Sequence, residues 1–323
     1  MLDRRRLLAA AGGLALAPSA ASAGAWQVLA DREITLVVPF SPGGSTDVAA
    51  RLLGRKFADL GLRLVVMNRS GGSGVEGTGY VARQQPTGLV LLSATPTAML
   101  FIAARQNTGF TRHDFTPIAL WSSAAFAFVV RTGSPIATMR DLLQAAHDRR
   151  GTLAVGSTGS GGEYQYLIEE VFREAGSTIN YIGYRGGGDV ATAVAGGHVE
   201  AGYVSVAGSA QLVRDGQLRY LAHTSEASER LGAFPDVPHV AAFGSQQRQV
   251  AFNALMGPRG LPDALRDPLA AAVQEATEDR AFVTAHENMG MVVRYMGPAE
   301  LLAYLERLDQ TVIPGYRDWR PAT

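Results

Sequence analysis

The feature that most constrains the fold is a repeated order of apolar run, glycine-rich turn and helical pattern. The first unit starts with "ITLVVPF" at residues 34–40, turns at "SPGGST" and continues in a helical pattern to Leu60. The second unit, from Leu153, reads "LAVGSTGSGGEYQYLIEEVFREAG". A continuous apolar run is typical of a strand buried on both faces of a parallel sheet, because helices cover both sides of such a sheet.

The segments after the first unit repeat the alternation. An apolar run at 62–68 precedes a glycine-rich loop at 70–74, a helical pattern near 78–84 and another apolar run at 89–94. Strands that alternate with helices predict an α/β fold with a doubly wound, mainly parallel sheet. Ligands of such sheets bind at the carboxyl ends of the strands.

Composition limits the classes of function. The chain has 323 residues, 47% of them hydrophobic, which is enough for about two domains. A formal net charge of +0 gives no reason to expect a nucleic-acid partner. The absence of cysteine excludes disulfides, zinc thiolate sites, iron–sulfur clusters and cysteine nucleophiles.

The amino terminus reads as an export signal. Three arginines, Arg4 to Arg6, precede an apolar segment at 7–17, and small residues end at Ala21-Ser22-Ala23. This order is typical of a secretory signal peptide, expected at residues 1–23, and the paired arginines also fit the twin-arginine route. The apolar segment is shorter than the ~20 residues that span a bilayer. A periplasmic location is therefore expected.

Both glycine loops could bind an anion. The first N–H groups of a helix lack internal partners and lie at the positive end of its dipole, and glycines let the backbone approach a ligand closely. The loops at 41–45 and 156–162 both meet these conditions. For one loop alone, a tight turn without a ligand is an equally good interpretation. Two loops of matching layout favour an acid held between two lobes.

Other motifs predict no catalysis. "GSGVEG" at 72–77 matches G-x-G-x-x-G, but no acidic residue follows about 20 positions later at the end of a strand. No serine has the G-x-S-x-G elbow, and the six histidines are scattered. We therefore expect no catalytic residue, no metal site and no cofactor.

An ordered set of segments resembles the Bug family, the periplasmic solute receptors of tripartite tricarboxylate transporters. The segments are "VVPFSPGGSTDVAAR", "VVMNRSGGSGVEGTGYVARQQPTG", "AVGSTGSGGEYQYLIEEVF", "YIGYRGGGDVATAVAGGHVEAGY", "LVRDGQLRYLAHTSEASER" and "FPDVPHV". The resemblance implies a two-lobed periplasmic binding fold of type II, a Venus flytrap. Lobe one would comprise 26–126 plus 227–323 and lobe two 127–226, with hinges near 126–130 and 221–224.

The resemblance also implies a carboxylate ligand held by both lobes. The first-lobe positions that match the family's site are Phe40, Ser41, Gly43, Gly44, Asp47, Ser93 and Thr95. The second-lobe positions are Ser157, Thr158, Gly159, Ser160, Gly161, Tyr184, Arg185, Gly186 and Ser205. Asp47 is expected to cap its helix and order the loop rather than touch the acid. A solvated arginine at 185 and a core tyrosine at 184 remain equally open.

Three positions depart from the family pattern. An acidic residue is usual where this chain has Val204 followed by Ser205, and a glutamate is usual where it has Ala242 or Phe243. Family members usually carry a histidine near the start of the second-lobe helix, where this chain has Glu163 after an apparent one-residue insertion. An acid beside an anion site either points to solvent, where the first turn of a helix favours it, or binds an amine of the ligand.

The expected function is capture without chemistry. A monomeric receptor would close on a small carboxylate-bearing metabolite and deliver it to the membrane permease subunits of a tripartite transporter. A periplasmic sensor that reports to a membrane partner is the alternative, and a periplasmic enzyme on the same fold is a weaker one. Dicarboxylates, tricarboxylates, aromatic acids, amino acids and amides all remain open as ligands.

Overall fold

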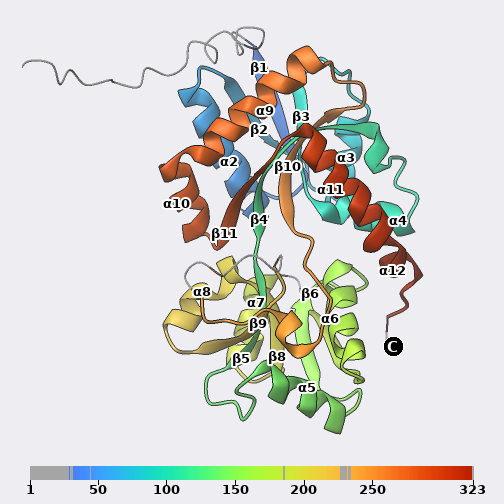
Figure 1. Cartoon of the computed structure of the whole chain (residues 1–323), viewed down its shortest axis with the longest axis vertical. Coiled ribbons are helices and arrows are strands. Elements are labelled where there is room, and N and C mark those ends of the chain that lie inside the picture. Colours follow the sequence, from blue (N-terminus) through green and yellow to red (C-terminus); the bar gives the residue numbers. More distant parts are fainter. Residues whose placement is uncertain are drawn as a thin grey trace, which may run out of the picture.

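The chain forms two lobes stacked along the long axis of the molecule (Figure 1). The computed structural model describes residues 29, 32–43, 45–184, 186–225, 231 and 234–321. The expected signal peptide, Gly44 and Arg185 lie outside the described residues. Each lobe has its own sheet with helices on both faces, so the two-lobed α/β fold predicted from the sequence is confirmed.

The first lobe is built on a six-stranded sheet with the order β11-β4-β10-β3-β1-β2. Its strands are β1 (Glu33–Val38), β2 (Arg63–Asn68), β3 (Val90–Ala94), β4 (Phe115–Ala124), β10 (Phe252–Pro258) and β11 (Met291–Met296). The second lobe has a five-stranded sheet with the order β7-β6-β8-β5-β9. Its strands are β5 (Phe126–Arg131), β6 (Ala154–Thr158), β7 (Asn180–Tyr184), β8 (Ala201–Ser205) and β9 (Leu218–His223).

Both sheets are mixed, with less parallel pairing than the sequence pattern suggested. β1 pairs in parallel with β2 and β3, and β6 pairs in parallel with β7 and β8. β10 and β5 each run antiparallel to both of their neighbours. The parallel strands belong to the βαβ units that the sequence revealed, whereas the antiparallel strands are those by which the chain enters or leaves a lobe.

Helices cover both faces of each sheet and enclose four apolar cores. In the first lobe, α2 (Ser45–Asp59), α9 (Asp263–Glu278) and α10 (Arg280–Asn288) contribute to one core. The other face packs against α3 (Val75–Ala82), a single-turn π-type helix η2 (Thr97–Ile102), α4 (Ala103–Arg105), α11 (Pro298–Thr311) and α12 (Ile313–Asp318). The second lobe has α5 (Met139–Asp148) and α6 (Glu163–Glu174) on one face, and α7 (Gly187–Ala195) and α8 (Val206–Arg214) on the other.

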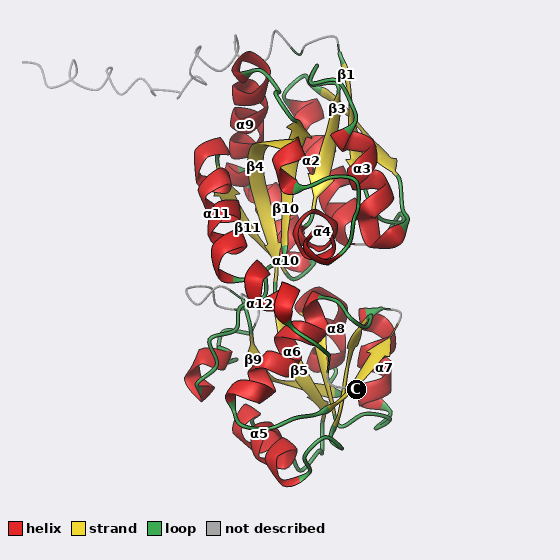
Figure 2. Ribbon diagram, turned by 90° about the vertical axis from the view of Figure 1, so that its right-hand side faces the viewer, coloured by secondary structure: helices red, strands yellow, loops and turns green. Residues whose placement is uncertain are grey.

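Three segments connect the lobes. Strand β4 runs into β5 through Ala125, and the chain returns from β9 to β10 through residues 224–251. The carboxyl-terminal segment then crosses from the first lobe onto α6 (Figure 2). There the Tyr316 hydroxyl donates to the Gly161 carbonyl at 3.2 Å, and Trp319 Nε1 donates to Glu169 Oε2 at 2.9 Å.

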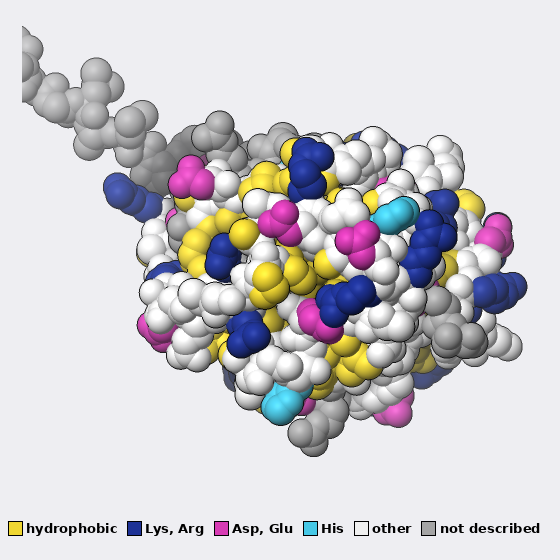
Figure 3. Space-filling view, turned by 90° about the horizontal axis from the view of Figure 1, so that it is seen from below, with side chains coloured by type: hydrophobic (Ala, Val, Ile, Leu, Met, Phe, Trp, Pro, Cys, Tyr) yellow, Lys and Arg dark blue, Asp and Glu magenta, His cyan; other side chains and the backbone are white. Residues whose placement is uncertain are grey.

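Figure 3 shows the end of the molecule seen from below. On this face, basic, acidic and apolar side chains are mixed rather than gathered into a patch of one charge sign. No helix among the described residues is long and apolar enough to span a membrane.

The glycines that mimic a dinucleotide fingerprint serve close packing instead. A Cβ on Gly77, in α3, would lie 2.5 Å from the Arg69 carbonyl oxygen and 2.8 Å from the Pro39 Cα atom. Real Cβ atoms do not approach backbone atoms so closely, so α3 rests against the end of β1 only because residue 77 has no side chain.

This close approach makes Gly77 sensitive to substitution. We predict that Gly77→Ala lowers the free energy of unfolding by about 1–3 kcal/mol, because backbone must move to admit the methyl group. The matched control is Gly188→Ala in α7, where a Cβ meets nothing within 4 Å. That change should stabilise by about 0.4–1 kcal/mol. Urea unfolding measures both, and equal effects at the two positions would contradict the packing account.

Candidate functional site

The first glycine loop connects β1 to α2 and presents its tip to solvent. Ser41 and Gly43 are exposed, Phe40 is half-buried, and Gly43 adopts a left-handed φ of +84° that favours glycine. The helix begins at Ser45, within the stretch predicted from the sequence as the turn. The loop therefore places backbone groups at the carboxyl edge of the sheet.

Asp47 holds this loop from beneath. It is 2% exposed, and its Oδ2 accepts from the Gly43 N–H and from Arg51 Nε, both at 2.9 Å. Its Oδ1 accepts from Asn68 Nδ2 at 2.8 Å. The hydrogen bond from Arg51, with help from Gly43 and Asn68, lowers the Asp47 pKa to about 2 against the opposing effect of burial. The carboxylate is fully engaged within the protein, which fits an ordering role.

Ser93 and Thr95 lie at the carboxyl end of β3, beside that loop. β1 and β3 are parallel neighbours, with Val37 opposite Leu92, so both strands end at the same edge. The two hydroxyl oxygens are buried and have no hydrogen-bond partner in the described part of the chain. Unpartnered buried hydroxyls in a native fold require an explanation, and a bound ligand is one.

The second-lobe residues gather at the carboxyl end of their own sheet. Thr158 pairs with Tyr184 across β6 and β7, and the Gly159 N–H donates to the Tyr184 carbonyl at 2.8 Å. Beyond them, Gly159, Ser160 and Gly161 are exposed and Gly186 precedes α7. The structure thus brings the predicted residues into one cluster per lobe.

Two of the predicted hydroxyls already have structural partners. Ser157 is 1% exposed and donates to the Tyr203 carbonyl at 2.8 Å. The Ser205 oxygen accepts from the Gly208 N–H at 3.2 Å and caps α8. Both fix the ends of their strands.

Glu163, the first residue of α6, is buried rather than solvated. The residue is 5% exposed, so the alternative in which it points to solvent is wrong, and the alternative in which it binds an amine stays a prediction. Its Oε1 accepts from Thr97 Oγ1 at 2.6 Å, which joins the start of α6 to the segment after β3 in the other lobe. Burial raises the pKa of this carboxyl, and the Thr97 hydrogen bond opposes that shift.

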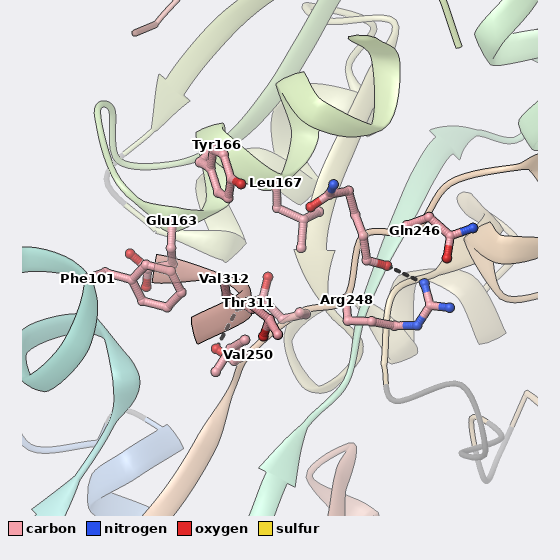
Figure 4. Close-up of a pocket in the computed structure, with 11 residues that line it drawn as sticks. Phe101, Glu163, Tyr166, Leu167, Gln246, Arg248, Val250, Thr311 and Val312 are labelled. Atoms are coloured by element: carbon pink, nitrogen blue, oxygen red, sulfur yellow. Dashed lines mark hydrogen bonds between the residues drawn. The ribbon is translucent and has the colours of Figure 1, made fainter. Parts of the chain in front are cut away.

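A pocket of about 320 Å³ opens between the lobes next to Glu163 (Figure 4). It lies between α6, the end of α11 and residues 246–250 of the connection from β9 to β10. Its lining comprises Phe101, Glu163, Tyr166, Leu167, Gln246, Gln247, Arg248, Gln249, Val250, Thr311 and Val312. None of the ligand residues predicted from the sequence lines it.

Of the residues that line this pocket, only Glu163 was singled out from the sequence. Its hydrogen-bond partner Thr97 could have been found, because Ser93, Thr95 and Thr97 place hydroxyls at alternate positions at the end of β3 and after it. Phe101, Tyr166 and the 246–250 segment carried no such signal, because they meet only in the tertiary fold. No group of three or more possible metal ligands occurs among the residues that the structure describes.

Asp47 provides a test of the loop. Because the pKa of Asp47 in the folded protein, about 2, lies below the ordinary aspartate value of 3.8, its stabilising effect is complete above pH 5 and declines as the pH falls toward 2. We predict that Asp47→Asn costs about 1–2 kcal/mol at pH 7 and about half as much at pH 3. Urea unfolding at both pH values measures this.

The control for that variant is Asp59→Asn on the same helix. The Asp59 side chain is 69% exposed and lies 4.0 Å from Lys56, so its loss should change stability by less than about 0.5 kcal/mol. An Asp47→Asn penalty that does not shrink between pH 7 and pH 3 would contradict the assignment.

The sequence of the chain matches a known protein family. The model of the tripartite tricarboxylate transporter family receptor, TctC, matches residues 49–308. Protein BugT of Bordetella pertussis is 31% identical over 264 residues, 80% of each chain.

Solved structures of similar fold include a member of the same family. A TctC solute binding protein from Polaromonas has a TM-score of 0.77 at 27% identity, covering 89% of this chain and 97% of that one. Rpa4515 of R. palustris, solved with adipate, has a TM-score of 0.73 at 25% identity, with coverage of 89% and 97%. The family model covers well over half of the sequence, and the chain belongs to the tripartite tricarboxylate transporter receptor family.

Proposed function

We propose that this protein is an exported receptor that captures a small carboxylate-bearing metabolite between its lobes. The observation that carries the proposal is the pair of unpartnered buried hydroxyls, Ser93 and Thr95, at the strand edge beside the first glycine loop. Hydroxyls and free backbone N–H groups at helix starts are suitable donors to a carboxylate. Adipate, the ligand of the relative from R. palustris, is a dicarboxylate.

Capture would work by closure. The second-lobe loop at 159–162 faces solvent at the carboxyl end of its sheet, as the first-lobe loop does. A ligand that touches both lobes favours the closed state by its differential affinity for that state. The closed form would then deliver its ligand to the membrane permease subunits of a tripartite transporter. This step follows the family and requires no reaction at the site.

The proposal predicts binding of acids. In a thermal-shift panel of dicarboxylates, tricarboxylates and amino acids, a ligand at a hundred times its Kd should stabilise the fold by about 2.7 kcal/mol. Neutral amides of the same acids provide the control and should give smaller shifts. If the amides shift the melting temperature as much as the acids, carboxylate capture is contradicted.

Thr95 separates a ligand contact from a structural one. We predict that Thr95→Val weakens acid binding about 10- to 100-fold, because a hydrogen bond to a charged group is lost. Stability of the empty protein should not fall, because the Thr95 hydroxyl has no partner in the protein to lose. Calorimetric titration and urea unfolding measure the two effects.

The matched control is Thr87→Val. Thr87 is exposed and precedes β3 at the end opposite to Thr95. Its replacement should leave affinity unchanged. Wild-type affinity in Thr95→Val would exclude that hydroxyl from the site.

A further inference from the structure

The Glu163 carboxyl lacks a counter-charge. No basic side chain forms an ion pair with it among the residues described, and its side-chain hydrogen bond comes from the neutral Thr97. A buried carboxylate without a positive partner is unfavourable, so such groups take up a proton or acquire a cation. The residue at the start of α6 is therefore poised to accept one or the other.

The surroundings of Glu163 suit a cation. Phe101 and Tyr166 line the same pocket, and the ring of Tyr316 contacts both, with centroid separations of 5.0 Å and 5.6 Å. Figure 4 shows Phe101 beside Glu163 at one end of the pocket. Aromatic faces next to a carboxylate attract ammonium groups through the ring quadrupole and the charge.

The opposite end of the pocket carries the opposite charge. Arg248 lies there, away from Glu163 (Figure 4), and its Nη1 donates to the Gln247 carbonyl at 2.7 Å. Glu163 and Arg248 are the two charged residues of the lining. A cavity of about 320 Å³ is at the small end of the range for small-molecule sites, about 300–1,000 Å³.

We propose that this pocket binds the ammonium group of a small aminocarboxylate, with Glu163 as its counter-ion and Phe101 and Tyr166 as its apolar walls. Arg248 provides the complementary charge for the acid end. The inference rests on the ligand class of the proposed function, a small carboxylate, and not on its position, because the unpartnered hydroxyls at the end of β3 and the two glycine loops do not line this pocket. It adds a specificity-determining residue. A zwitterion would neutralise Glu163 on closure, whereas a second carboxylate at that end would be repelled.

The competing account is a protonated Glu163. Burial raises the pKa of this carboxyl in the empty protein, and a neutral acid could donate a hydrogen bond to a ligand carboxylate. That receptor would prefer dicarboxylates. The two accounts therefore predict opposite selectivity for ligands of equal length.

The test is calorimetric titration of the protein, refolded to remove carried ligand, with four molecules of matched length. 4-Aminobutyrate has both charges, glutarate has two acids, pentanoate has one acid and butylamine has one ammonium. The same four kinds of molecule are also titrated with one carbon fewer and with one carbon more in the chain, so that ligands of three lengths are compared. We expect the aminocarboxylate to bind at least about 10-fold more tightly than the dicarboxylate of its length.

The other outcomes separate this inference from the proposed function. Glutarate binding as tightly as 4-aminobutyrate, or more tightly, overturns the ammonium site and leaves carboxylate capture standing. Butylamine binding as tightly as 4-aminobutyrate supports the ammonium site and overturns carboxylate capture. Binding of none of the series overturns the ammonium site, and the wider panel of acids then decides carboxylate capture.

Glu163→Gln tests the residue itself. It keeps the size and the acceptor oxygen of the side chain but removes its charge. Affinity for 4-aminobutyrate should fall about 10- to 100-fold, and affinity for glutarate should hold or rise. The control is Glu170→Gln, whose carboxylate pairs with Arg173 on the outer part of α6. An unchanged selectivity ratio in Glu163→Gln would refute the assignment, and the wild-type ratios decide the question if the variant does not fold.

Discussion

The hydrogen bond from Thr97 to Glu163 is the contact between the two lobes on which the account of the site depends. It joins the segment after β3 to the first turn of α6 and leaves an acid 5% exposed at their junction. Burial at this junction raises the pKa of the carboxyl, which has no basic partner among the described residues. In the receptor that we propose, a ligand that neutralises this carboxyl would favour the state in which the lobes meet.

Around that contact, each lobe prepares its surface in the same way. Asp47 in the first lobe and Ser157 in the second use their polar atoms on neighbouring backbone and side chains. These buried partners hold the strand ends and loops in place. The buried hydroxyls of Ser93 and Thr95, in contrast, have no hydrogen-bond partner in the described part of the chain.

Local features were predictable from sequence, and contacts between distant segments were not. The βαβ units and the ordering of the first loop by Asp47 follow from strand, turn and cap patterns within a few residues. β11, α10 and the antiparallel placement of β10 had no comparable local signal. The burial of Glu163 depends on a residue 66 positions away, and the pocket depends on the 246–250 segment meeting α6. Only the path of the chain between lobes brings these together.

The most direct test of capture between lobes is hydrogen exchange with and without the tightest-binding carboxylate of the panel. The amides of residues 43–47 in the first lobe and 159–163 in the second should become protected together, at saturation by one molecule of ligand per protein. Protection of both loops would support an acid held by both helix starts. Protection of one loop alone, or of neither, would contradict the central claim that the lobes share the ligand.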